Sequence, residues 1–370
     1  MIPVYQPYLT GKEKEYVAGC LDSTWISSRG EFVSRFEAEF EKFIGVRHAT
    51  TVCNGTVALH LAMMALGLGP GDEVIVPTLT YVASVNTIVQ CGATPVFVDS
   101  LASTWQIDPK DVQRKITART RAVMAVHLYG APCEMTSLVE LCDQHGLFLV
   151  EDCAEAFGTL YGDKHVGTFG DIATFSFFGN KTITTGEGGM VVTNNSELFA
   201  KAYHLKTQGV SPTREYWHDT IGYNYRMTNI CAAIGVAQLE HANEILSKKR
   251  LIRDWYDDGL AGLPLTTHRE SPNTRHSWWM YSILTRDAGE CSRLRSELRV
   301  AAVETRPLFH PVHLLPPYFG GLHFPVAESL SSRGINLPSY PGLERKQVQA
   351  ICQIVRAQYE GNEAKIVPFR

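Results

Sequence analysis

One aspartate and one lysine near the middle of the sequence have the types and spacing that cofactor chemistry requires. Asp152 follows the apolar segment 147–150, which reads as a strand, and Lys181 lies in a loop of Gly, Asn and Thr after a second strand-like run, 172–178. A lysine amine forms a Schiff base with an aldehyde cofactor, and a carboxylate keeps a pyridine nitrogen protonated so that the ring accepts electrons. The pair therefore predicts pyridoxal phosphate (PLP) chemistry.

The surroundings of this pair strengthen the prediction. Ser176 comes shortly before the lysine, and a glycine-rich exit at 186–189 leads into a third predicted strand, 190–193. Taken singly, Asp152 would be read as an ordinary strand-end aspartate and Lys181 as a surface lysine. Their combination with the serine and the glycine-rich exit is what indicates a cofactor site.

A second segment has the composition of a phosphate-binding site. A short strand breaks at Asn54 and Gly55, and a helix rich in Ala and Leu begins at about Thr56. The first amides of a helix have no intrahelical partner and bind anions readily. The bland alternative is that Asn54 only caps the helix. The glycine-rich segment 67–72 follows a helix and contains a proline, so we interpret it as a turn and not as a dinucleotide loop.

The composition argues against several classes of protein. A chain of 370 residues predicts two domains, and a formal net charge of −4 with scattered basic residues disfavours nucleic acid as a partner. Nine cysteines without a Cys-x-x-Cys pair are typical of reduced thiols. No signal peptide and no apolar run of about 20 residues is visible, so we expect a cytoplasmic protein without membrane segments.

The remaining pattern predicts the elements that must hold these residues in place. Apolar residues at helical spacing predict helices at 12–22 and 31–43. From residue 73 onwards strands and helices alternate, with strands at 74–77, 95–99, 122–127 and 147–150 and helices at 82–90 and 135–145. Such alternation, with largely apolar strands, predicts a mostly parallel sheet covered by helices on both faces. Ligands bind such sheets beyond the carboxyl ends of the strands, where Tyr81, Asp152 and Ser176 fall.

We predict a large cofactor-binding domain over residues 1–240 and a smaller α+β domain over residues 241–370. A long helix at about 228–259 would connect them. Within the smaller domain the pattern predicts a strand at 279–284 and helices at 291–300 and 346–359. A helix at 197–205 and a polar, aromatic-rich loop at 207–218 precede the connecting helix.

Two segments of this sequence resemble the DegT/DnrJ/EryC1/StrS family of PLP-dependent sugar aminotransferases. They are Glu-Asp-Cys-Ala-Glu-Ala-Phe-Gly at 151–158 and the stretch 167–189, which contains Ser176 and Lys181. The resemblance covers nearly the whole chain and implies the aspartate-aminotransferase fold, called fold type I. It further implies that Lys181 carries PLP as a Schiff base, with pyridoxamine phosphate as the intermediate form, and that Asp152 pairs with the ring nitrogen.

The resemblance also implies roles for other cofactor-binding residues. Following Gly55, the amides of Thr56 and Val57 would hold the phosphate, together with the hydroxyl of Ser176. The remaining roles fall to Tyr81, which would stack on the ring, Glu155, where Gln is commoner in the family, and Asn224, which would reach the phosphate of the neighbouring subunit. The active site would then be shared across a homodimer.

For the substrate, the resemblance implies a nucleotide-linked ketosugar. The segment 177–192 is most similar to family members that aminate C4 of GDP-4-keto-6-deoxymannose, with glutamate as donor, for surface polysaccharide (O-antigen) synthesis. The resemblance also implies that four residues lie near the nucleotide sugar: Trp25, Ser27, Arg306 and His313. The planar guanidinium of an arginine pairs well with the oxygens of a pyrophosphate. We expect no metal at His310 and His313, because Pro311 separates them and no third ligand is evident.

Several alternatives differ from this prediction in chemistry. An 8-keto octulosonate or a dTDP-linked ketosugar stays open as the acceptor, because no residue separates these substrates. Related dehydratases carry His in place of Lys181, which argues against that class. A non-catalytic regulator or scaffold would need neither Asp152 nor Lys181, and a nicotinamide oxidoreductase would need a Gly-x-Gly-x-x-Gly helix start. We therefore predict an aminotransferase.

Overall fold

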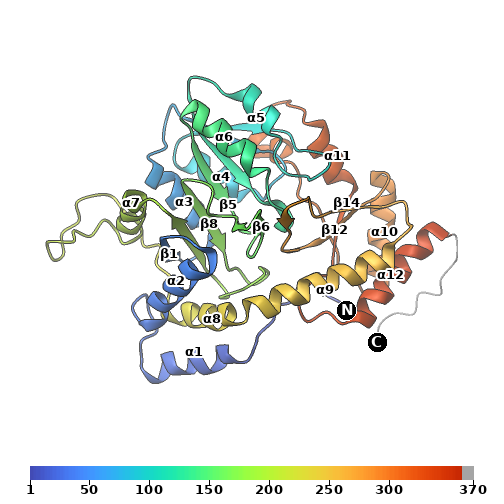
Figure 1. Ribbon diagram of the computed structural model, residues 1–370, viewed down its shortest axis with the longest axis horizontal. Coiled ribbons are helices and arrows are strands. Elements are labelled where there is room, and N and C mark those ends of the chain that lie inside the picture. Colours follow the sequence, from blue (N-terminus) through green and yellow to red (C-terminus); the bar gives the residue numbers. More distant parts are fainter. Residues whose placement is uncertain (361–370) are drawn as a thin grey trace.

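The computed structural model describes residues 1–360. A seven-stranded sheet lies at its centre, with helices packed around it (Figure 1). Its strand order is β1-β9-β8-β5-β4-β2-β3, and the strands from β8 to β3 are parallel to one another. β9 runs antiparallel to both of its neighbours. The strands are β1 (His48–Val52), β2 (Glu73–Pro77), β3 (Thr94–Val98), β4 (Thr120–Val126), β5 (Phe148–Asp152), β8 (Ile172–Ser176) and β9 (Gly189–Thr193). The predicted α/β fold with a mostly parallel sheet is confirmed.

Helices cover both faces of this sheet, because alternate residues of each strand point to opposite sides. Met124 of β4 belongs to the core beneath α3, α4 and α7, whereas its neighbour Val123 belongs to the core beneath α5 and α6. At the other end of the sheet, Phe175 packs under α2 and α8. The bounds are α1 (Lys12–Asp22), α2 (Glu31–Ile44), α3 (Gly55–Leu66), α4 (Ala83–Gln90), α5 (Pro109–Lys115), α6 (Met135–His145), α7 (Ser196–Lys206) and α8 (Asn229–Glu240).

A second, antiparallel sheet forms in the C-terminal part, with the order β10-β12-β14-β13. Its strands are β10 (Thr266–Thr267), β12 (Tyr281–Leu284), β13 (Arg306–Pro307) and β14 (Gly334–Leu337), and its helices are α9 (Ala242–Leu260), α10 (Ala288–Val300), α11 (Pro325–Arg333) and α12 (Arg345–Glu360). A small third sheet joins β6 (Leu160–Tyr161), β7 (Lys164–His165) and β11 (Thr274–Arg275), and short 3-10 turns lie at η1 (Leu128–Gly130), η2 (Val312–Leu314) and η3 (Pro316–Tyr318).

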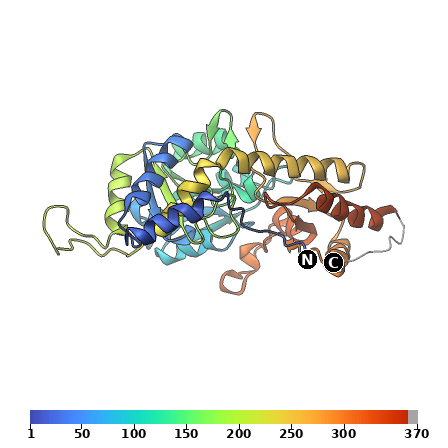
Figure 2. The same cartoon turned by 90° about the horizontal axis from the view of Figure 1, so that it is seen from below.

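The two larger sheets lie on either side of residue 240, where we predicted a domain boundary, and that boundary stays a prediction. The first residues of the chain do not follow the division. Ile2 forms a β-bridge with Val303 and is buried in the C-terminal core, and the N-terminus lies beside the C-terminal elements (Figure 2). The last part of the predicted second domain, 361–370, lies outside the described residues. Within residues 1–360 no helix is long and apolar enough to cross a membrane.

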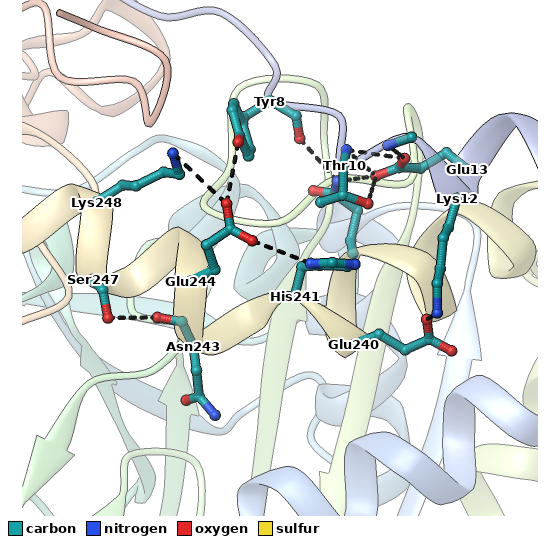
Figure 3. Close-up of polar contacts among 12 residues, drawn as sticks. Tyr8, Thr10, Lys12, Glu13, Glu240, His241, Asn243, Glu244, Ser247 and Lys248 are labelled. Carbon is teal, nitrogen blue, oxygen red and sulfur yellow. Dashed lines mark hydrogen bonds and ion pairs between the residues drawn. The ribbon is translucent and has the colours of Figure 1, made fainter.

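The predicted single helix at 228–259 is wrong, because the structure has two helices that meet at His241. His241 leaves the α-helical conformation, with φ −106° and ψ 11°. α8 packs on the core that contains Phe36. α9 begins on that same core, through Leu246, and reaches the C-terminal core further along, through Tyr256. Residues near the N-terminus line this junction (Figure 3), where Lys12 pairs with Glu240 at 2.8 Å. The change from one core to the other therefore lies within α9, whereas the break at His241 interrupts a segment whose apolar pattern is continuous.

Candidate active site

A cavity of about 490 Å³ opens at the carboxyl ends of β4, β5 and β8. This is the size and the place expected of a small-molecule site in an open α/β sheet. It brings together eight of the residues that the sequence predicted: Gly55, Thr56, Val57, Tyr81, Asp152, Glu155, Ser176 and Lys181. The roles of these residues toward the cofactor stay predictions.

Asp152 is fixed at the end of β5 by two hydrogen bonds. Its Oδ2 accepts a hydrogen bond from the hydroxyl of Ser84 at 2.8 Å, and its Oδ1 accepts one from the amide of Ala154 at 3.0 Å. Ser84 is itself bonded to Thr80 at 3.0 Å. Hydrogen bonds to an ionised carboxylate favour the charged form and hold it in one orientation. The side chain of Asp152 is therefore held in one orientation at the edge of the cavity.

Lys181 reaches into the same cavity from the loop after β8. Its Nζ lies 3.9 Å from Oε1 of Glu155 and 4.2 Å from the centre of the Trp279 ring. Burial lowers the pKa of Lys181, and the charges of Glu155 and Asp152 oppose this shift. The backbone carbonyl of Lys181 accepts a hydrogen bond from the hydroxyl of Tyr5. A buried amine with a lowered pKa is the form that a Schiff base and a proton shuttle both require.

Glu155 is a second buried carboxyl group at this end of the cavity. Burial raises its pKa to about 7, while the charge of Lys181 works in the opposite direction. The amide of Tyr129 donates to its Oε2 at 2.7 Å and fixes the side chain. Glu155 thus contributes a carboxyl group that titrates near neutral pH beside the lysine.

The N-terminus of α3 lies against the end of β8. A Cβ placed on Gly55 would be 2.7 Å from Cβ of Ser176, so only glycine permits this approach. Among residues 1–360, the amides of Gly55 and Thr56 have no hydrogen-bond partner. Together with the Ser176 hydroxyl they form a donor set that fits a phosphate.

The structure corrects one detail of the predicted phosphate site. The amide of Val57, which we assigned to the phosphate, donates to Oδ1 of Asn54 at 3.0 Å. Asn54 is the N-cap of α3, and its side chain satisfies one of the first amides of the helix. The capping role that we gave as the alternative for Asn54 and the anion site therefore coexist at the same helix end.

Tyr81 lies at the mouth of the cavity, where its ring centre is 5.6 Å from that of Phe309. The phenol is largely exposed in the single chain. A ring at this position can cover one face of a flat cofactor that is held by Asp152 and the α3 N-terminus.

Five predicted site residues do not line this cavity. Asn224 is exposed and accepts a hydrogen bond from Arg226 at 3.0 Å. Trp25 is exposed beside α2, and the carbonyl of Ser27 accepts the amide of Asn229 at 2.6 Å. The two C-terminal residues are also elsewhere. Arg306 is exposed and pairs with Glu304, whereas His313 is fully buried between Thr78 and Glu328.

Other residues of the cavity were missed by sequence reasoning. Trp279 and Phe309 come from the C-terminal part and line the cavity beside Lys181 and Tyr81, respectively. No local sequence motif predicts that they line the cavity, because this depends on how the C-terminal part packs against the central sheet. Ser84 does not line the cavity but donates a hydrogen bond to Asp152 from the start of α4, and its place three residues after Tyr81 in the sequence is the signal that could have identified it.

A lysine amine, a fixed carboxylate and a helix-N-terminal anion site in one cavity of this sheet define a PLP enzyme. The model of the DegT/DnrJ/EryC1/StrS aminotransferase family matches residues 7–356, and the chain belongs to this family. The predictions of fold type I, of PLP as the cofactor and of a transaminase are thereby confirmed.

The GDP-perosamine synthases of Escherichia coli O157:H7 and Vibrio cholerae are similar to this chain over nearly its whole length. They are 59% and 56% identical to it, over 97% and 96% of this chain and 98% of each relative. Among solved structures, Helicobacter pylori PseC, an aminotransferase involved in the biosynthesis of pseudoaminic acid, superposes with a TM-score of 0.92. That pair is 28% identical and covers 97% of this chain and 99% of PseC.

Proposed function

We propose that this transaminase converts GDP-4-keto-6-deoxymannose to GDP-perosamine with glutamate as the amino donor, in the synthesis of a surface polysaccharide such as O-antigen. The observation that carries the proposal is the near full-length likeness to two GDP-perosamine synthases. A cavity that holds both Lys181 and Asp152 supports the chemistry. The acceptor alternatives, an 8-keto octulosonate and a dTDP-linked ketosugar, become outcomes of the test.

Different residues of the cavity would bind different parts of the cofactor. Lys181 would bind its aldehyde, Asp152 its ring nitrogen, and the amides of Gly55 and Thr56 its phosphate, with Ser176. Bound PLP supplies an electron sink for the pair released at the substrate carbon. Tyr81 would cover one face of the ring and exclude water.

Lys181 then has a second task as the proton carrier. Its Nζ would move a proton between Cα of the amino donor and C4′ of the cofactor. A general acid–base group works best with a pKa near the working pH, and burial moves Lys181 in that direction. The carboxylate of Glu155, 3.9 Å away, limits that shift when it is ionised.

We further infer that the active enzyme is a homodimer in which Asn224 reaches the phosphate of the neighbouring subunit. Asn224 lies outside the cavity of its own chain and forms a β-bridge with Thr207. This bridge closes the base of the loop that projects from the body of the molecule after α7 (Figure 1). Trp25, Ser27 and Arg306 stay candidates for contacts with the nucleotide sugar. All nine cysteines are free, which supports a reducing compartment such as the cytoplasm.

Mass spectrometry of the products tests the proposal. The enzyme with glutamate would be given GDP-, dTDP- and octulosonate-type ketosugars, and we expect an amino sugar from the GDP substrate. Lys181→Ala should abolish the absorbance of lysine-bound cofactor and lower turnover by about 10³-fold or more. Lys201→Ala, on the exposed surface of α7, is the control and should match the wild type. Wild-type turnover by Lys181→Ala would refute the chemistry, and amination of only another ketosugar would refute the substrate.

A further inference from the structure

The indole of Trp279 lies directly against the amine of Lys181. We propose that Trp279 is a positioning residue that keeps the Lys181 amine and the peptide before it in place for the reaction. The inference rests on the proposed role of Lys181 as the cofactor lysine. Trp279 would then be a residue of the active site that comes from the C-terminal part and not from the central sheet.

Trp279 contacts this short segment at two points. Its ring takes the Lys181 Nζ on one face at 4.2 Å from the ring centre, and its Nε1–H donates to the backbone carbonyl of Asn180 at 2.7 Å. A cation over an indole face is attracted to it, and the attraction grows where water is excluded. The same side chain therefore fixes both the end of the lysine side chain and the backbone from which that side chain starts.

Trp279 can do this because its own position is fixed by the C-terminal part. Its carbonyl accepts a hydrogen bond from the buried Nζ of Lys249 at 3.0 Å, and its ring is parallel to that of Tyr129, with ring centres 6.2 Å apart. The residue before it, Trp278, donates its amide to Nδ1 of His276 at 2.8 Å. The indole is thus a rigid wall and not a mobile side chain.

The need for such a wall follows from the reaction. Lys181 alternates between being joined to the cofactor and being a free amine, and it must return to the same place in each half of the cycle. Glu155 lies 3.9 Å from Nζ, which is beyond hydrogen-bond distance, so the carboxylate alone does not fix the amine. The indole face gives the free amine a defined position inside the cavity.

Two variants separate the contacts. Trp279→Phe keeps an aromatic face and loses the donor to Asn180, whereas Trp279→Leu loses both. Trp255→Phe is the control, because this half-buried tryptophan of α9 packs on the C-terminal core and does not line the cavity. We expect kcat to fall about tenfold in Trp279→Phe and about 100-fold in Trp279→Leu, with KM nearly unchanged. The kinetic isotope effect with Cα-deuterated glutamate should rise in both, because proton transfer becomes slower.

A measurement on the cofactor-free protein makes the result independent of turnover. Hydrogen exchange of the peptide that spans residues 178–183 should become faster by about tenfold in both Trp279 variants and stay unchanged in Trp255→Phe. Unchanged exchange with kcat within twofold of the wild type in Trp279→Phe would overturn the proposal, as would equal losses in Trp255→Phe. If Lys181→Ala were active, the proposed chemistry would fail, while the exchange data would still report on Trp279.

Discussion

Glu155 is a titratable residue at a position where a neutral glutamine would have nearly the same size and shape. Its carboxyl group lies beside Lys181, and burial raises its pKa to about 7 from an ordinary value of 4.5. The folded protein therefore holds this proton more tightly than the unfolded chain. This proton contributes about 3 kcal/mol to the free energy of unfolding. The contribution is fully present below about pH 4.5 and is lost as the pH rises through about 7.

Glu155→Gln removes this titration and keeps the hydrogen bond from Tyr129, because the amide oxygen of Gln still accepts it. In the cofactor-free protein, we expect Tm of the variant to exceed that of the wild type by a few degrees more at pH 8 than at pH 5. Thermal melts at both pH values measure the difference. Glu140→Gln, on the exposed face of α6, should show no such dependence on pH. An equal difference at both pH values would contradict the assignment.

At the scale of elements, the site depends on how closely α3 approaches β8. The first turn of the helix supplies the amides of Gly55 and Thr56, and the strand end supplies Ser176. Any side chain at residue 55 must push these two elements apart, since its Cβ would be 2.7 Å from Cβ of Ser176. Residue 55 must therefore be glycine because α3 and β8 approach so closely, and not because the chain turns there.

Gly55→Ala should weaken the binding of PLP by about 10-fold to 100-fold, because overpacking of this kind costs about 1–3 kcal/mol. Titration of the cofactor-free protein with PLP, followed by absorbance, gives the dissociation constant. Gly19→Ala is the matched control, since a Cβ at that helical glycine meets no neighbouring atom within 4 Å. Wild-type affinity in Gly55→Ala would show that the phosphate does not bind at this junction.

Local sequence patterns predict some of these elements and not others. The helices at 12–22 and 135–145 have the predicted bounds, because their apolar spacing starts and stops with the element. Asp152 and Lys181 were predicted to share a site because both follow strands of one sheet. The break at His241 carries no local signal, because residues on both sides favour a helix and both sides pack on the same core. Trp279 was missed because it comes from the segment that leads into β12 of the second sheet, far along the sequence from Lys181.

At the scale of the whole molecule, a loop extends beyond the globular body. It leaves the end of α7 and returns at α8, and both views show it projecting into solvent (Figures 1 and 2). In the single chain Tyr216 is 96% exposed and Ile221 is 88% exposed, which is unusual for apolar side chains that have no partner. The exposed apolar loop and Asn224 beside it support the proposed dimer with shared sites.

Mixed dimers test whether Asn224 acts on the neighbouring subunit. Asn224→Asp places a negative charge where the proposal puts a phosphate, so this variant should bind PLP poorly, and Lys181→Ala should be inactive. A purified heterodimer of the two variants would combine the intact Lys181 of one chain with the intact Asn224 of the other at one of its two sites. It should recover about half of the wild-type activity, because C2 symmetry gives one complete site per dimer. The heterodimer of Lys181→Ala and Lys181→Arg has no complete site under either arrangement and should stay inactive. Absence of recovery in the first heterodimer would show that both residues serve the same chain.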